Sequence, residues 1–164
     1  MRTSILTVLA FMIMSSVSYA SDVYITQSGA SLTANINQDG QTNKVGNDTT
    51  DFTMSGDSQT YDIDQVGNTN TITGSVTGSS NTVTINENST ATMLNTDKKV
   101  TSVTLTGSSN TVTSTHTGAG DHDTTLAHTG SSGTFSITQG GAHDSVVDMT
   151  TSGASHSVTI TVDD

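Results

Sequence analysis

Apolar residues alternate with Thr and Ser along most of the chain. In Thr82-Val83-Thr84-Ile85, and again in Ser157-Val158-Thr159-Ile160, every second residue is aliphatic. A period of two with many β-branched residues is typical of strands that bury one face. The pattern therefore predicts an all-β chain built from short strands.

Glycines divide these strands at a regular spacing of mostly 11 or 12 residues. The anchors are Gly29, Gly40, Gly56, Gly67, Gly78, Gly107, Gly118, Gly130, Gly141 and Gly153. The longest gap, after Gly78, can hold a further unit anchored on Ser89 and an insertion near residues 95–100. Because a residue without Cβ allows positive φ, we expect each anchor to mark a sharp turn.

Other residue types keep fixed offsets from these anchors. Apolar residues stand five positions after the anchor, with Asp123 as a break, and Glu87, His116 and His128 share the glutamine column two positions before it. The amides of the two polar columns are Gln27, Gln38, Asn43, Gln65, Asn70, Asn81, Asn110 and Gln139. Ile recurs seven positions after alternate anchors: Ile36, Ile63, Ile85, Ile137 and Ile160. The true repeat is therefore a pair of inequivalent halves with a period of 22–24 residues.

Such a repeat predicts a β-solenoid. Strand, turn, strand and turn make one flattened coil, and stacking successive coils buries their inner faces. We expect five to six coils, with the inward amides bonded to equivalent amides above and below, as in cross-β ladders. In the C-terminal half, we expect Asp121, Asp123, Asp144, His128 and His156 to enter these interior columns.

The first 20 residues have the three parts of a secretory signal peptide. Arg2 precedes an uncharged apolar run, Ile5–Met14, and small residues at Ser18 and Ala20 precede the expected cleavage site. The run is shorter than the roughly 20 residues of a membrane-spanning helix. We therefore expect cleavage after residue 20, a solenoid over residues 21–164, no membrane span after signal removal, and an extracellular or cell-surface location.

Composition narrows the function classes further. Hydrophobic residues make up 30% and aromatic residues 4%, too few for a conventional core, so the ladders must complete the interior. The net charge is −11 with four Lys and Arg, which argues against a nucleic-acid partner. No Cys is present, which excludes disulfide scaffolds and thiol chemistry.

Asp121, His122 and Asp123 follow Gly118 and Gly120 in a turn that resembles the calcium-binding turns of other β-solenoids. Those sites use tandem repeats, whereas this motif occurs once, and Ca²⁺ takes six to eight oxygen ligands. We therefore expect no cofactor, and we interpret His116 and His128 as ladder substitutions. No Gly-x-Ser-x-Gly or His-Glu-x-x-His motif is present, so we do not expect an enzyme.

The hexapeptides Gln38–Asn43 and Gln65–Asn70 share the pattern Gln-x-Gly-x-x-Asn. This pattern resembles the curlin repeat of bacterial curli fibre subunits, and the resemblance is best over Val23–Asn81. The family has a second Gln in each period, where this chain has Met54, Val76, Leu105 or His116. The resemblance implies a secreted subunit that stacks end to end into amyloid fibres for adhesion and biofilm. It also implies partners: further copies, other fibre subunits or a secretion apparatus.

The end coils, Ile25–Gln38 and Val158–Val162, would make the contacts between copies, because a solenoid end exposes unpaired backbone. An alternative is a non-polymerising acidic solenoid on a cell surface or phage virion, whose Thr and Ser faces bind a glycan or another partner. The aspartates of the C-terminal half motivate that alternative. A calcium-stabilised domain is a third hypothesis.

Overall fold

The computed structural model describes residues 21–29, 31–39, 43–46, 52–67, 69–88 and 98–163. The predicted signal peptide, Gly40 and Ser89 lie outside these ranges. Every regular element within them is a β-strand. Accordingly, no described segment forms a helix with the length and apolarity needed to cross a membrane.

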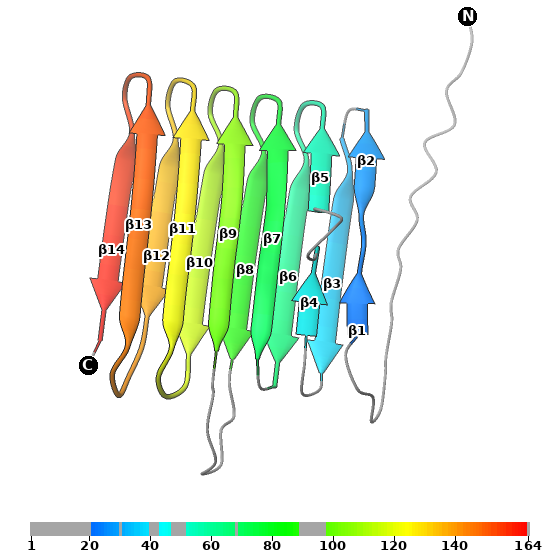
Figure 1. Ribbon diagram of the computed structural model, residues 1–164. Helices are drawn as coiled ribbons and strands as arrows, with labels where there is room; N and C mark the ends of the chain where they lie inside the picture. Colours follow the sequence, from blue (N-terminus) through cyan, green and yellow to red (C-terminus); the bar gives the residue numbers. More distant parts are fainter. Residues whose placement is uncertain are drawn as a thin grey trace, which may run out of the picture.

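The strands form two sheets. The front sheet of Figure 1 contains β1 (Ser21–Val23), β2 (Thr26–Ser28), β4 (Asn43–Val45), β5 (Phe52–Ser55), β7 (Asn70–Thr77), β9 (Lys99–Thr106), β11 (His122–Thr129) and β13 (Ser145–Ser152). The back sheet contains β3 (Thr33–Asp39), β6 (Thr60–Val66), β8 (Thr82–Asn88), β10 (Thr111–Thr117), β12 (Thr134–Gln139) and β14 (Ser157–Val162).

The chain alternates between the sheets, and each strand pairs in parallel with the strand one coil further on. The back sheet of the described chain is six strands deep, which defines six layers. Layer one holds β1, β2 and β3, and layer six holds β13 and β14. The predicted β-solenoid of five to six coils is confirmed.

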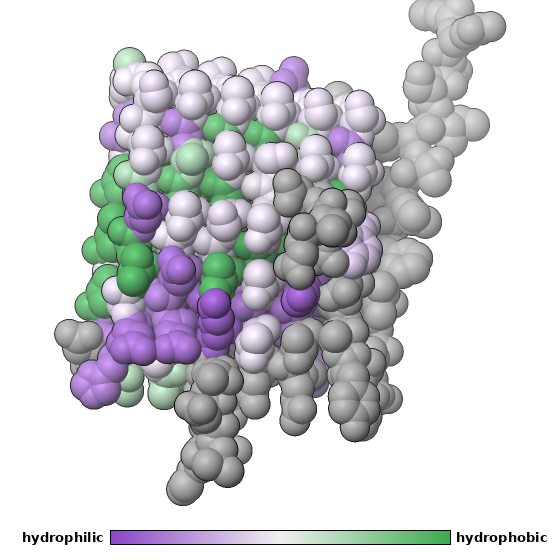
Figure 2. All heavy atoms as spheres, viewed as in Figure 1, coloured by the Kyte–Doolittle hydropathy of each residue, from purple (hydrophilic) through white to green (hydrophobic). Residues whose placement is uncertain are grey.

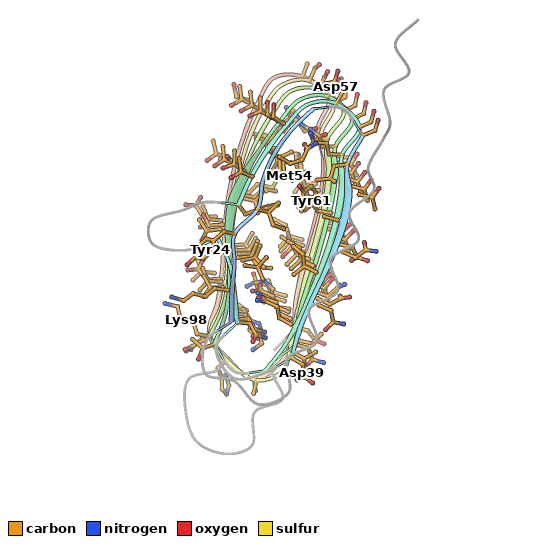
Figure 3. All side chains as sticks on the ribbon, turned by 90° about the vertical axis from the view of Figure 1, so that its right-hand side faces the viewer. Tyr24, Asp39, Met54, Asp57, Tyr61 and Lys98 are labelled. Atoms are coloured by element: carbon orange, nitrogen blue, oxygen red, sulfur yellow. The ribbon has the colours of Figure 1, made fainter. Side chains whose placement is uncertain are left out.

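The inequivalent half-repeats form the two sheets. All five recurring isoleucines lie in the back sheet, where Ile63 stands opposite Ile36 on one side and Ile85 on the other. Ile63 and Ile85 have no exposed surface. Figure 3 looks along the stack and shows Met54 and Tyr61 pointing into the space between the sheets, with Asp57 on the outside of a turn. Stacking therefore buries one face of every inner strand.

One family of turns joins each front strand to the following back strand. Each of these glycine–serine turns has a glycine and, two residues later, a serine with positive φ. The pairs are Gly29 and Ser31, Gly56 and Ser58, Gly78 and Ser80, Gly107 and Ser109, Gly130 and Ser132, and Gly153 and Ser155. A Cβ on Gly78 would lie 1.9 Å from the carbonyl oxygen of Gly56. Glycine is therefore required both by backbone conformation and by the close approach of the next layer.

The return turns, which lead from the back sheet to the next front strand, are one residue longer after Gly118 and Gly141 than after Gly67. Asn70 opens β7 three residues after Gly67, whereas His122 opens β11 four residues after Gly118. A shift of one residue reverses which side chains face inward.

The expectation that Asp121, Asp123 and Asp144 lie in interior columns is therefore wrong. Thr124 is buried in place of Asp123, and Asp144 is exposed. Val146 belongs to the apolar column because it stands five positions after Gly141, but it is 56% exposed, while Val147 packs against the core. The 12-residue spacing after both glycines was the sequence signal for this shift.

Two segments of the front sheet interrupt the regular repeat. The first interruption separates β4 from β5. Phe52 begins β5 and pairs with Gly74 of β7, and a Cβ on Gly74 would lie 1.8 Å from the Phe52 ring. The second is the insertion predicted near residues 95–100. Residues 89–97 lie outside the described ranges, but Lys99 and Val100 belong to β9. The C-terminal end of that predicted insertion is therefore wrong.

Candidate functional site in the solenoid interior

The glutamine column predicted from the sequence is divided between the two sheets, because Gln27 and His128 lie in the front sheet. From here on, the name glutamine column is kept for five residues of the back sheet, one from each of layers one to five. They are Gln38, Gln65, Glu87, His116 and Gln139. The Nε2 of Gln65 donates to Oε1 of Gln38 at 2.6 Å, and the Nε2 of Gln38 donates to the carbonyl oxygen of Lys44 at 3.2 Å. Both side chains are at least 95% buried. These bonds offset part of the cost of placing the two amides in a dry interior. Oε1 of Gln65 and both polar side-chain atoms of Gln139 have no hydrogen-bond partner among the described residues, so the predicted ladder does not continue to Gln139.

Glu87 and His116 occupy the middle of the glutamine column. Nε2 of His116 lies 2.7 Å from Oε2 of Glu87, and neither side chain has exposed surface. The Thr101 hydroxyl donates to the same carboxylate oxygen at 2.7 Å and lies 3.1 Å from His116 Nε2. Ser114 Oγ lies 3.5 Å from that nitrogen. Although Ser, His and Glu meet here, no surface is open to a substrate, so the arrangement is suited to holding layers together.

Opposite lies the asparagine column of the front sheet: Asn43, Asn70, Lys99 and His122. Nδ2 of Asn43 lies 3.4 Å from Oδ1 of Asn70. Lys99 has no exposed surface, and its Nζ donates to the carbonyl oxygens of Gly120 at 3.2 Å and Ala119 at 3.4 Å. Sequence reasoning missed this buried cation because Lys99 was assigned to the insertion.

The predicted asparagine ladder is in fact divided between the two ends of the coil. Asn81 and Asn110 lie beside the glycine–serine turns, far along the strands from Asn43 and Asn70. Oδ1 of Asn81 accepts from the backbone N–H of Gln59 at 3.0 Å, and Oδ1 of Asn110 accepts from that of Asn81 at 3.2 Å. These amides therefore link layers through the backbone rather than through one another.

The glycine–serine end of the interior also holds Gln27 and two histidines. Nε2 of Gln59 donates to Oε1 of Gln27 at 2.9 Å. In layer five, Nε2 of His128 lies 3.2 Å from the carbonyl oxygen of Gly107. The ring of His128 is 4.9 Å from that of His156 and 5.1 Å from that of Phe135, centroid to centroid. At the glycine–serine end of the interior, an aromatic cluster in the last layers therefore takes the place of the polar side chains of the first layers.

Burial favours the neutral form of two of these imidazoles. Burial, followed by the charge of Lys99, lowers the pKa of His122. Burial likewise lowers the pKa of His128, with a smaller contribution from His156. His122 also stacks on His116, with ring centroids 5.9 Å apart and ring planes at 18°.

The three residues of the turn that resembles calcium sites do not all lie on the surface: Asp121 and Asp123 are partly exposed, whereas His122 is 2% exposed. Asp121, His122 and Asp123 line a shallow depression together with Asp144 and Lys98, within the hydrophilic region at the lower ends of β9, β11 and β13 in Figure 2. A hydrogen bond with Asp144, followed by partial burial, raises the pKa of Asp121. No group of three or more potential ligands that could hold a metal ion occurs in the described part of the chain.

Comparison with protein-family models, curated proteins and solved structures finds no match for this chain.

Proposed function

We propose that this chain is a secreted structural subunit, similar to the curlin repeats, that stacks end to end into amyloid-type fibres for surface adhesion and biofilm. The observation that carries the proposal is the last layer. Val158, Ile160 and Val162 of β14 are 45%, 46% and 46% exposed, yet Val158 and Ile160 continue columns whose inner members are buried. Figure 2 shows apolar side chains gathered along this edge.

The inner neighbours of these residues show what a covering layer would change. Phe135 and Ile137, directly beneath Val158 and Ile160, are each 1% exposed. Burying the exposed apolar surface of β14 would contribute about 25 cal/mol per Å². Among the described strands, β14 pairs with β12 alone, so its other edge also offers backbone donors and acceptors to a further parallel strand.

A second copy of the chain fits this edge in chemistry and register. If layer one of the next copy continued the columns, Ala34 would follow Val158, Ile36 would follow Ile160, and Thr33 would follow Ser157. These are the same classes of residue that already stack within the chain. The partner expected at the C-terminal edge is therefore the N-terminal layer of another copy.

Fibre growth provides the first test. Residues 21–164, purified and concentrated at neutral pH, should form fibres with thioflavin fluorescence and a meridional repeat of about 4.7–4.8 Å. Ile160→Lys should slow growth strongly, because it places a charge in the covered column. Thr159→Lys, on the outer face of the same strand, is the matched control. A wild-type chain that stays monomeric for days at high concentration would overturn the proposal.

Cysteine pairing tests the register. The natural chain has no Cys, and adjacent strands bring Cα atoms within the 4.4–6.8 Å range of disulfides. Thr159→Cys combined with Asn35→Cys should produce disulfide-linked multimers in oxidised fibres. Thr159→Cys combined with Thr84→Cys, which lies in layer three, should not extend beyond dimers.

The alternative of a non-polymerising acidic module on a cell surface or virion has one observation in its favour. Asp148 on the outer face of β13 and Asp163 after β14 place carboxylates beside the apolar edge. A monomer that binds glycans on an array and forms no fibres would establish this alternative. Fibre growth without glycan binding would exclude it.

A further inference from the structure

Four of the five histidines of the chain point into the last three layers of the solenoid. His116, His122 and His128 are 0%, 2% and 1% exposed, and His156 is half-buried. The fifth, His143, lies exposed on a return turn. The described interior of layers one to three holds no histidine. The interior histidines of the described chain are therefore confined to one half of the stack.

Around His122, the buried groups offer one carboxylate, that of Glu87, and His116 already contacts it. Glu87 of β8 is the one buried carboxylate of the described chain, and burial, followed by the charge of Lys99 of β9, already lowers the pKa of His122. The facing residue of β12 is the neutral Gln139, and that of β13 is Ser145. A proton on His122 would place a second buried cation beside Lys99, and Glu87 is the one buried group of opposite charge in the described part of the chain. The carboxylates of Asp121, Asp123 and Asp144 lie at the outer surface, where water screens them.

Around His128 there is no facing carboxylate. Its neighbours in the same column are Leu105 of β9 and Thr151 of β13, and its ring contacts are Phe135 and His156. Nδ1 of His128 has no hydrogen-bond partner among the described residues. A proton added there would create a buried charge without a partner, which strongly destabilises a dry interior.

We propose that His122 and His128 form an acid-sensitive switch that opens the last three layers of the solenoid in mildly acidic solution while layers one to three stay folded. When these layers open, the imidazoles become exposed to water and can accept protons. In a solenoid each coil contacts only its neighbours, so part of the stack can open without the rest. The same transition would remove the apolar edge of β14.

The sign and the pH window follow from linkage. A histidine in the open chain titrates near pH 6.5, and His122 and His128 titrate lower in the closed chain. Their contribution to stability is therefore fully present above about pH 6.5 and is lost as the pH falls toward their closed-state pKa values. Asp121 acts in the opposite direction, because its pKa is raised in the folded state.

Hydrogen exchange tests the switch on the dilute, monomeric chain, so the outcome does not depend on fibre formation. Exchange of peptides from β9–β14 and from β3–β8 is measured between pH 7.5 and 5, with each rate divided by the intrinsic rate at that pH. Each histidine that titrates only when open should lower protection by about 10-fold per pH unit below its open-state pKa. Peptides of β3 and β6 should keep their protection.

The solenoid itself supplies neutral replacements, because each of the two histidines shares a column with one. Asn70 shares a column with His122 and Leu105 shares one with His128, which gives the variants His122→Asn and His128→Leu. The combined variant should keep constant protection down to pH 5, whereas His143→Gln should behave like the natural chain. Should the combined variant not fold, His128→Leu alone should reduce the pH dependence by about one proton.

Three outcomes would overturn the switch: protection of β9–β14 that does not change with pH, equal loss in all layers, or pH dependence that persists unchanged in His128→Leu. Fibre growth at neutral pH reports on the proposed function instead, so the two ideas can fail separately.

Discussion

Replacing Gly78 by alanine probes the closest approach between layers. At φ +136°, the backbone of Gly78 lies outside the region that residues with a Cβ readily adopt. The new Cβ would lie 1.9 Å from the Gly56 carbonyl oxygen, although real Cβ atoms essentially never approach within 3.0 Å of another heavy atom. The two layers must therefore separate by about 1 Å at this turn or distort.

The expected cost has two parts. Backbone strain of this kind costs about 1–3 kcal/mol. Separation of these two layers also weakens the hydrogen bonds from Gly56 N–H to the Thr77 oxygen and from Ser58 N–H to the Ser79 oxygen, both 2.9 Å. Each is worth about 0.5–1.5 kcal/mol. Together, Gly78→Ala should lower the free energy of unfolding by roughly 2–6 kcal/mol.

Gly141→Ala is the matched control. Its φ of +58° lies in the left-handed region, and a Cβ there would meet nothing within 4 Å. Its expected cost is only about 1–2 kcal/mol. Urea unfolding followed by far-ultraviolet circular dichroism gives both values from the midpoint and slope. Equal midpoints for the two variants would refute the argument from close approach between layers.

Three further predictions concern the apolar interior. Ile63→Ala should destabilise the chain by about 2–5 kcal/mol. Ile36→Ala should destabilise it by clearly less, because Ile63 is fully buried and Ile36 is half-buried. Equal losses of stability in urea unfolding would contradict this prediction. The Tyr61 hydroxyl has no hydrogen-bond partner among the described residues, so Tyr61→Phe should leave stability unchanged or raise it by about 1 kcal/mol. Burial raises the pKa of Tyr61 to about 12. The stability that comes from keeping the phenol neutral should therefore be present below about pH 10 and be lost as the pH rises toward 12. Alkaline unfolding of Tyr61→Phe should not show this loss. Gly74→Ala places a Cβ 1.8 Å from the Phe52 ring and should lower the free energy of unfolding by about 1–3 kcal/mol. In a double-mutant cycle, Phe52→Leu should restore part of this lost stability. Additive effects of the two substitutions would refute direct contact between the residues.

The sequence was informative wherever the repeat was regular. The period-two alternation predicted the strands, and the isoleucines seven residues after alternate anchors indicated two inequivalent halves, which are the two sheets. Glu87 and His116 were placed in the glutamine column, although their contact at 2.7 Å was not anticipated. Column membership is readable because stacking keeps the side chains of successive coils in register.

The failures arose where one residue changed the register. A single extra residue in the return turn after Gly118 moved Asp123 outward and Thr124 inward, because neighbouring side chains of a strand point to opposite faces. Lys99 was misassigned for a related reason: charge and position beside an irregular segment suggested a surface loop. In the structure, the Lys99 ammonium donates to the carbonyl oxygens of Gly120 and Ala119, and no pattern in the sequence predicts these hydrogen bonds.

The glycine–serine turns have a consequence for how such a chain can change its length. The glycine–serine turn has nearly the same backbone shape in every layer, from Ser31 at φ 62° to Ser155 at φ 63°. A unit cut at equivalent turns, such as Gly107 to Gly130, could be duplicated or deleted while its neighbours still meet a matching surface. Rods of different height are thus accessible by recombination of whole coils, whereas the insertion of a single residue within a strand would turn its buried side chains toward water.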